Sequence, residues 1–383
     1  MKAYEQFLGL VRHVFDGEAL PQNVDWDAMS QISVHHHMEG IVYRAMLDGK
    51  DVPDTVREPL KRRYHVALGQ QVQQVAYAQQ IFRALSEAGI PYAPLKGMIM
   101  RPLYPMSDLR LSCDVDFLYP MAHRKAVHEI LLSHGFLRKQ EWNHHDVYTR
   151  GILTVEPHFR LTEDRAGEEY YRDAWSRLTR QEDGSYTFTD EDFYVFHVFH
   201  MYHHFEDGGV GIRSVLDLHV WNRSKPDVDR AYIEAELDKL GLLRFTHAFE
   251  KLSRVWFGGE ETDQTTSLLA EYVLRGGSYG TDEQKAQMHA SKHGAQKSAK
   301  VRYVWGRVFP SYREMKHRYP CLKYLPILLP IFWIVRLFDV AFTNRGKRMQ
   351  DGLYTASQLK GETIGRTTRL RELLDLPSDG GKR

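Results

Sequence analysis

Asp114 and Asp116 have the residue type and the spacing of a metal site. They lie in "CDVDFLYP", where acidic and apolar residues alternate. Side chains at positions i and i+2 project from one face of a strand, so we expect both carboxylates on one face and Val115 and Phe117 in the core. Two carboxylates on one face repel each other. Mg²⁺ (or Mn²⁺) offsets this repulsion, because it binds carboxylate oxygens together with phosphates and water. Without metal, replacing both acids by asparagine is expected to relieve repulsion and leave the fold intact.

A third carboxylate follows in "ILTVEPH". Period-two alternation places Glu156 and His158 on one polar face of this predicted strand. If this strand lies beside that of Asp114, Glu156 completes a three-carboxylate site, a known arrangement for two-metal phosphoryl or nucleotidyl transfer. Pro157 has no amide hydrogen, so the segment is expected at a sheet edge or a bulge.

The residues before the two aspartates are candidates for phosphate binding. "PLKG" ends an apolar strand and "MIMRPLYP" is expected to form the next helix. The Gly97 backbone and the helix N-terminus would offer amide donors, and Lys96 would add positive charge. Arg110 would either neutralise phosphate or brace the carboxylates. Each residue also has a purely structural interpretation: Lys96 as a surface lysine, Gly97 as part of a tight turn and Arg110 as a salt-bridge partner.

A histidine-rich helix is predicted downstream, with one stripe formed by His197, His200 and His204. No cysteine or carboxylate set accompanies the stripe, so packing is favoured over zinc binding. His200 and His204 are retained as candidate substrate contacts, as is His158. Arg213 and Asp217 are four residues apart and are expected to form an intrahelical ion pair, with Arg213 a further candidate for the cleft.

The periodicity of apolar residues predicts the elements that must position these side chains. Apolar residues have helical spacing up to about residue 88, alternate as in strands up to about residue 162, and have helical spacing again after that. The fold class is therefore predicted as α+β, a small mixed sheet flanked by extensive helical regions. A polar stretch from 284 to 300 is expected to be a loop or mobile linker. Four regions follow from these patterns: 1–88 helical, 89–162 α/β, 163–283 helical and 284–383 basic.

The formal net charge of +1 conceals a basic C-terminal part. Residues 284–350 contain fourteen Lys and Arg against two acidic residues, which leaves the rest of the chain at −11. An anionic partner, either a membrane surface or RNA, is expected there. The apolar segment 324–335 is shorter than the ~20 residues that span a bilayer, and two prolines interrupt it. Burial against the helical body is favoured over a surface-lying membrane contact.

Composition bounds the class of protein. A chain of 383 residues with 43% hydrophobic content predicts a folded protein of two or three domains. Only two cysteines occur, and the first twenty residues carry acids and no long apolar core, so neither a disulfide framework nor a signal peptide is predicted. A cytoplasmic location is expected, with peripheral attachment to the membrane as the alternative.

Together these motifs resemble a known family. The run L-K-G, L-Y-P, R-x-S-x-D-x-D, a helix ending in G-F, and V-E-x-H is similar to the bacterial family of uncharacterised nucleotidyltransferases in the DNA polymerase β-like superfamily. The later histidines, G-x-R and D-L pair resemble its helical section, so the resemblance covers most of the chain. It implies a small nucleotidyltransferase-type sheet that carries the metal carboxylates. The chain departs from the wider superfamily at Gly97-Met98, where Gly-Ser or Gly-Gly is usual, and Lys96 is the expected substitute for the serine.

The resemblance also implies a reaction, the transfer of a nucleoside monophosphate from an NTP to an acceptor hydroxyl or phosphate on a sugar, RNA or protein. Asp114 and Asp116 would hold the metals, and Glu156 would hold one metal or act as base. The triphosphate would be gripped by Lys96, Gly97 and Arg110. Two alternatives stay open: a toxin-type enzyme with a tRNA acceptor, whose binding would weaken with salt, and a non-catalytic nucleotide-binding or scaffolding module at a membrane or partner.

Overall fold

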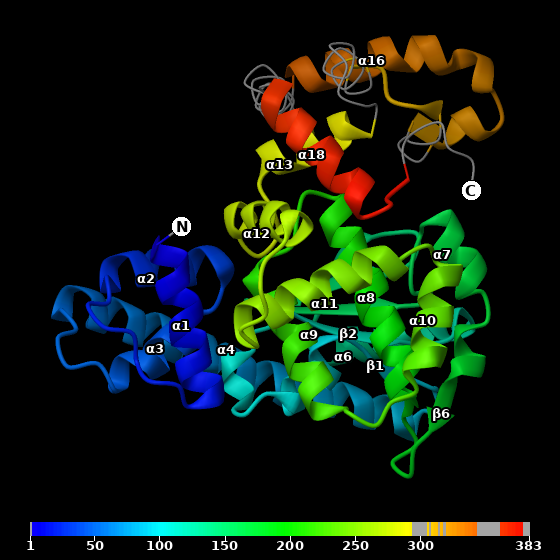
Figure 1. The fold of residues 1–383 in the computed structure, drawn as a ribbon. Coiled ribbons are helices and arrows are strands. Elements are labelled where there is room, and N and C mark those ends of the chain that lie inside the picture. Colours follow the sequence, from blue (N-terminus) through cyan, green and yellow to red (C-terminus); the bar gives the residue numbers. More distant parts are fainter. Residues whose placement is uncertain are drawn as a thin grey trace. The chain divides into compact units, whose positions relative to one another are not determined.

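A computed structural model describes residues 2–292, 305, 308–312, 315–316, 319–342 and 361–377 (Figure 1). The chain divides into two compact units. The first is formed by Met1–His200 and Ile212–Glu261, and the second by Met201–Gly211 and Thr262–Arg383. The finer division into four regions stays a prediction.

Four helices precede the sheet: α1 (Lys2–Asp16), α2 (Trp26–His36), α3 (Glu39–Leu47) and α4 (Asp54–Glu87). The C-terminal half of α4 buries Ala78, Ile81 and Leu85, which recur at helical spacing, in the core under the sheet. Gly89 follows with φ 66°, a left-handed conformation that glycine adopts without strain. Gly89 therefore follows directly on the end of α4 and lets the chain turn toward β1.

A five-stranded mixed sheet lies at the centre of the first unit, with the strand order β1-β2-β5-β4-β3. β2 and β5 run parallel, and the other neighbours run antiparallel. The predicted α+β class is therefore confirmed. The strands are β1 (Ala93–Pro94), β2 (Asp114–Leu118), β3 (Leu137–Glu141), β4 (Asp146–Arg150) and β5 (Leu153–His158).

One face of this sheet packs on α4 and on α6 (Arg124–Ser133). Val115 and Phe117 of β2 and Val155 of β5 are buried in that core, with at most 2% of their surface exposed. Because side chains alternate along a strand, the intervening residues of β2 and β5 project from the opposite face. The predicted inward orientation of Val115 and Phe117 is confirmed.

The position of Pro157 differs from the prediction. β5 is an internal strand, paired with β2 on one side and β4 on the other. Regular pairing with β4 ends at Val155 and returns only as an isolated bridge between His145 and His158. The missing amide hydrogen of Pro157 therefore falls where the ladder is already interrupted. The expectation of an edge strand is wrong because this interruption, not an edge, accommodates the proline.

The chain after the sheet is largely helical (Figure 1). A two-stranded antiparallel sheet of β6 (Leu178–Arg180) and β7 (Tyr186–Phe188) interrupts it. The helix α8 extends from the first unit into the second. The helices of this part are α7 (Arg165–Tyr170), α8 (Asp190–Glu206), α9 (Ile212–Ser224), α10 (Arg230–Lys239) and α11 (Leu243–Phe257).

The described part of the second unit contains α12 (Gln264–Gly276), α13 (Asp282–Ser291), α16 (Leu329–Phe342) and α18 (Gly361–Leu373). α13 covers the first half of the stretch predicted as a loop. Thr281 and Gln284 form a capping box, in which each side chain accepts a hydrogen bond from the other residue's amide. This cap explains why a polar sequence starts a helix here. The rest of that stretch, 293–300, lies outside the described residues.

The apolar segment 324–335 forms a 3₁₀ turn and the start of α16, and the expectation that it is buried is wrong. Tyr324 is 85% exposed, Ile327 82% and Ile331 55%. The side chain of Trp333 is only partly buried, and its Nε1 donates to the Pro310 carbonyl at 2.8 Å. Within the described residues, no helix has the length and apolarity needed to cross a membrane.

Candidate active site

The register of β2 and β5 brings the predicted acidic residues together. Asp116 pairs with Glu156 across the two parallel strands, and Leu118 pairs with His158. One carboxylate oxygen of Asp116, one of Glu156 and a ring nitrogen of His158 all lie within 4.8 Å of one another. Asp114 is two residues before Asp116 and projects from the same face. The geometry that the sequence predicted for these residues is present, while their roles stay predictions.

Asp116 is the most enclosed of the three acids. Its Oδ1 accepts from Lys96 Nζ at 2.8 Å and from His158 Nε2 at 2.9 Å. Only 2% of the Asp116 side chain is exposed, and 17% of that of Lys96. Burial alone would raise the pKa of Asp116, but Lys96 and His158 outweigh it and the pKa is lowered. Burial opposes the charge of Lys96 as well, yet Asp116 and the other acids raise its pKa. The two side chains therefore form an ion pair at neutral pH.

Glu156 and Asp114 are less well compensated. Burial, followed by the charges of Asp116 and Asp114, raises the pKa of Glu156 to about 7. Burial and Asp116 also raise the pKa of Asp114, although Ser112 Oγ lies 3.3 Å from Asp114 Oδ1 and opposes the shift. Lys96 contacts Asp116, while Arg213 and Arg101 act on Asp114 only through their charge. The raised pKa values of Glu156 and Asp114 show that these cations do not fully compensate the three carboxylates, which fits a bound divalent cation.

Lys96 reaches Asp116 from the turn between β1 and the short helix α5 (Gly97–Met100). Its backbone has φ 46°, which residues other than glycine rarely adopt. A Cβ at Gly97 would lie 2.9 Å from Ser112 Oγ, so any larger residue here would force Ser112 to move. The amides of Met98 and Ile99 already donate to the carbonyls of residues 95 and 96. This four-residue helix therefore offers fewer amide donors for phosphate than the sequence suggested.

Arg110 takes part in a buried network. Its Nε and Nη2 donate to the two oxygens of Asp217 on α9 at 2.8 and 2.9 Å, and the Tyr104 hydroxyl donates to the same carboxylate at 2.6 Å. Arg213, also on α9, donates to the Leu111 carbonyl at 2.9 Å. Asp217 is therefore held by Arg110 and Tyr104, not by the expected pair with Arg213. Both α9 residues brace the segment that leads into β2, and a phosphate contact by Arg110 stays a prediction.

The histidine stripe of α8 has varied surroundings. His197 is buried, and its burial lowers its pKa to about 4. The ring of His200 stacks with that of Phe196. His204 belongs to the second unit, is exposed, and has its ring 6.3 Å from that of Tyr279. His197 is packed in the interior, as the sequence favoured over zinc binding. Substrate contacts by His200 and His204 stay predictions.

Two features near the carboxylates were not predicted. Arg101 is 6% exposed, and burial, then Arg110, lower its pKa to about 10 against the opposing charge of Asp114. Its Nε has no hydrogen-bond partner among the described residues. His144 and His145 precede β4, and the His145 ring stacks on that of His158 at 4.7 Å. The available signals were the arginine inside "MIMRPLYP" and the histidine doublet in "NHHDVY".

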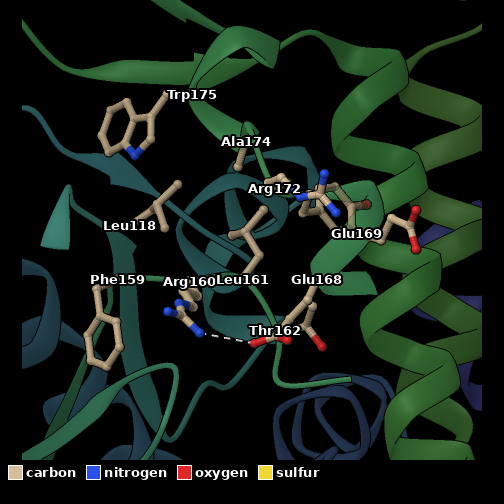
Figure 2. A pocket seen from close by; sticks show the side chains of 11 residues that line it. Leu118, Phe159, Arg160, Leu161, Thr162, Glu168, Glu169, Arg172, Ala174 and Trp175 are labelled. Atoms are coloured by element: carbon tan, nitrogen blue, oxygen red, sulfur yellow. Dashed lines mark hydrogen bonds and ion pairs between the residues drawn. The ribbon is translucent and has the colours of Figure 1, made fainter. Parts of the chain in front are cut away.

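A cavity of about 520 Å³ lies at the carboxyl ends of β2 and β5 (Figure 2). Leu118, on the same face as Asp116, and Phe159, which follows His158, form part of its wall, whereas the three acids do not line it. On this wall Arg160 forms an ion pair with Glu168 at 3.1 Å, drawn as a dashed line in Figure 2. The volume is typical of small-molecule sites, about 300–1,000 Å³, and ligands commonly bind at the carboxyl ends of parallel strands.

Comparison with known proteins identifies the family. The model of a family described as "Uncharacterised nucleotidyltransferase" matches residues 22–258, which include the sheet, the acidic residues and most of the helices around them. The chain belongs to this family, whose name implies an NTP substrate and an acceptor. No curated protein matches the chain. Among solved structures, the antibiotic-resistance factor ANT(2'')-Ia is similar with a TM-score of 0.33 and 11% identity, over 46% of this chain and 97% of that one.

Proposed function

We propose that the chain catalyses Mg²⁺-dependent transfer of a nucleoside monophosphate from an NTP to an acceptor hydroxyl or phosphate. The observation that carries the proposal is the register pair of Asp116 and Glu156 on parallel strands, with Asp114 on the same face. This set suits the metal ligands of an in-line displacement. Mg²⁺ bound there would offset the charge that develops on the transferred phosphate.

The described contacts support different roles for the surrounding residues. Asp114 and Asp116 are proposed as metal ligands, and Glu156 as a ligand or as base toward an acceptor hydroxyl, for which a pKa of about 7 is suitable. Lys96 keeps Asp116 ionised and is the first candidate for the triphosphate. Arg101, near Asp114 and with an unpartnered Nε, is the second. Arg110 is held through two hydrogen bonds by Asp217, which is not one of the proposed metal ligands and so would not release it when metal binds, and we rank it below Arg101.

The nucleoside or the acceptor is proposed to occupy the cavity beside Leu118 and Phe159. Its position along the same face as Asp116 supports this, as does the presence of Trp175 and two arginines in its wall. A bulky substitution at Ala174, which lines the cavity and is 6% exposed, should raise KM for one substrate more than it lowers kcat. The assignment would be contradicted if KM rose no more in the Ala174→Leu variant than in a variant outside the cavity.

The direct test is incubation with each labelled NTP, Mg²⁺ or Mn²⁺, and a cell extract as the source of acceptor. Glu156→Gln should lower transfer of label by orders of magnitude, while NTP binding, supported by Lys96 and the aspartates, falls less. Glu129→Gln, at an exposed position of α6, is the matched control. Undiminished transfer by the Glu156 variant would refute the assigned site.

The same assay separates the alternatives. Label on tRNA, with binding that weakens steeply as salt rises, would favour the toxin-type reaction. Metal-dependent NTP binding without any labelled product would favour a nucleotide-binding module.

A further inference from the structure

Three imidazoles gather beside the carboxylates. One ring nitrogen from each of His144, His145 and His158 lies within 4.8 Å of the other two. The rings of His144 and His145 have centroids 4.2 Å apart, and those of His145 and His158 stack at 4.7 Å. The backbone bridge between residues 145 and 158 joins the two segments that carry them. This bridge, together with the hydrogen bonds from the amides of residues 159 and 160 to the His144 carbonyl, holds the turn between β3 and β4 against the end of β5.

The hydrogen bonding of these rings is incomplete. His158 is only 3% exposed, and its Nε2 is engaged by Asp116 at 2.9 Å. Its Nδ1 is buried and has no hydrogen-bond partner among the described residues, and the same is true of His145 Nδ1. A buried nitrogen without a partner is costly, and in native proteins it commonly indicates a bound water or ion. Two such atoms in one cluster favour a bound ion that is coordinated by nitrogen lone pairs.

We infer that His144, His145 and His158 bind a transition-metal ion, with zinc as the best fit, at a site adjacent to the carboxylates. Imidazole nitrogens suit zinc and related divalent ions, whereas Mg²⁺ takes oxygen ligands. Sites with three histidines characteristically keep a fourth position open for water or substrate. Glu156 Oε2, 3.6 Å from His145 Nε2, lies close to that cluster.

The contact between Asp116 and His158 supports the inference. Histidines that bind a metal usually donate their second ring N–H to a carboxylate, which fixes the tautomer and the ring orientation. With Nε2–H donated to Asp116, His158 presents Nδ1 as the lone-pair atom. Asp116 would then serve as a proposed magnesium ligand and as the positioning partner of a zinc ligand. The inference does not rest on nucleotidyl transfer, because metal binding is measured without substrate.

The test uses the full chain, freed of metal by dialysis against a chelator and titrated with Zn²⁺ alone in the presence of excess Mg²⁺. The His144→Gln, His145→Gln double variant removes two ligands. His247→Gln, at an exposed histidine of α11, is the control. We expect one Zn²⁺ per parent chain, unaffected by Mg²⁺, and a Kd at least about 10- to 100-fold weaker in the double variant, since loss of even an outer-shell partner costs that much. The control should match the parent.

Three results would overturn the inference. Absence of Zn²⁺ binding would do so, as would undiminished binding by the double variant. Displacement of Zn²⁺ by Mg²⁺ would assign the zinc to the carboxylates instead. If the double variant does not fold, Co²⁺ bound to the parent decides the question: intense visible bands of a tetrahedral, nitrogen-rich site support the inference, and the weak bands of an octahedral oxygen site contradict it.

Discussion

Replacing Glu156 by glutamine should stabilise the metal-free protein at alkaline pH. The carboxylate is 22% exposed and lies beside Asp116, and burial with the neighbouring acids raises its pKa from 4.5 to about 7. Glutamine has nearly the same shape and carries no charge. The substitution therefore removes the cost of ionising Glu156 in the folded state and little else.

The sign follows from proton linkage. Between the two pKa values the folded protein keeps the proton that the unfolded chain has lost, so the free energy of unfolding of the parent falls as pH rises. Each unit of pKa shift corresponds to about 1.4 kcal/mol, so the loss is below about 1 kcal/mol near pH 5 and reaches about 3 kcal/mol near pH 8. The glutamine variant does not suffer this loss.

Urea unfolding of chelator-treated parent and variant at both pH values measures the difference. Saturating Mg²⁺ should stabilise the parent more than the variant, because the metal offsets the crowding that glutamine has removed. Glu129→Gln should leave the free energy of unfolding almost unchanged at either pH, as its carboxylate is exposed. If the advantage of the Glu156 variant were the same at both pH values, the carboxylates would not be crowded and the reasoning would be refuted.

Three further predictions concern other parts of the chain. Asp116→Asn should lower the free energy of unfolding by about 3–5 kcal/mol, since it leaves the Lys96 ammonium buried without its charged partner; an unchanged thermal melt would contradict this. Arg101→Met should weaken NTP binding about tenfold, the loss of one charge-assisted contact, without lowering Tm; calorimetry with a non-hydrolysable NTP measures it. Ile327→Ser with Ile331→Ser should leave circular dichroism and Tm unchanged because both side chains are exposed, and a large drop in Tm would show that they are core.

The shared face of the acids could be predicted from the sequence because one pattern serves two purposes. The alternation that buries Val115 and Val155 also turns Asp116 and Glu156 to the opposite face. No information about distant parts of the chain was needed beyond the pairing of two strands. We also expected that the fold would survive replacement of both aspartates. That expectation did not include the ion pair between Asp116 and Lys96, which is twenty residues away in the chain and would be lost.

Contacts over long separations could not be read from local spacing. Arg110 and Asp217 are 107 residues apart, and helical spacing favoured Arg213 as the partner of Asp217. β3 is exposed along its whole length, so it lacks the alternation that marks a half-buried strand. The segment 324–335 is apolar in composition, which predicts burial, yet its exposure depends on what the rest of the chain packs against it.

Lys96 connects the departure from the superfamily pattern to the charge state of the site. Its backbone has φ 46°, and its ammonium donates to Asp116 at 2.8 Å. Lys96, together with His158, keeps Asp116 ionised, but the pKa values of Asp114 and Glu156 stay raised. A divalent cation would supply the charge that Lys96 does not, and Glu156 would lose its proton as the cation binds. Lys96 would then be available to the triphosphate, and its contact with Asp116 and the proposed contact with phosphate would be two successive states of one site.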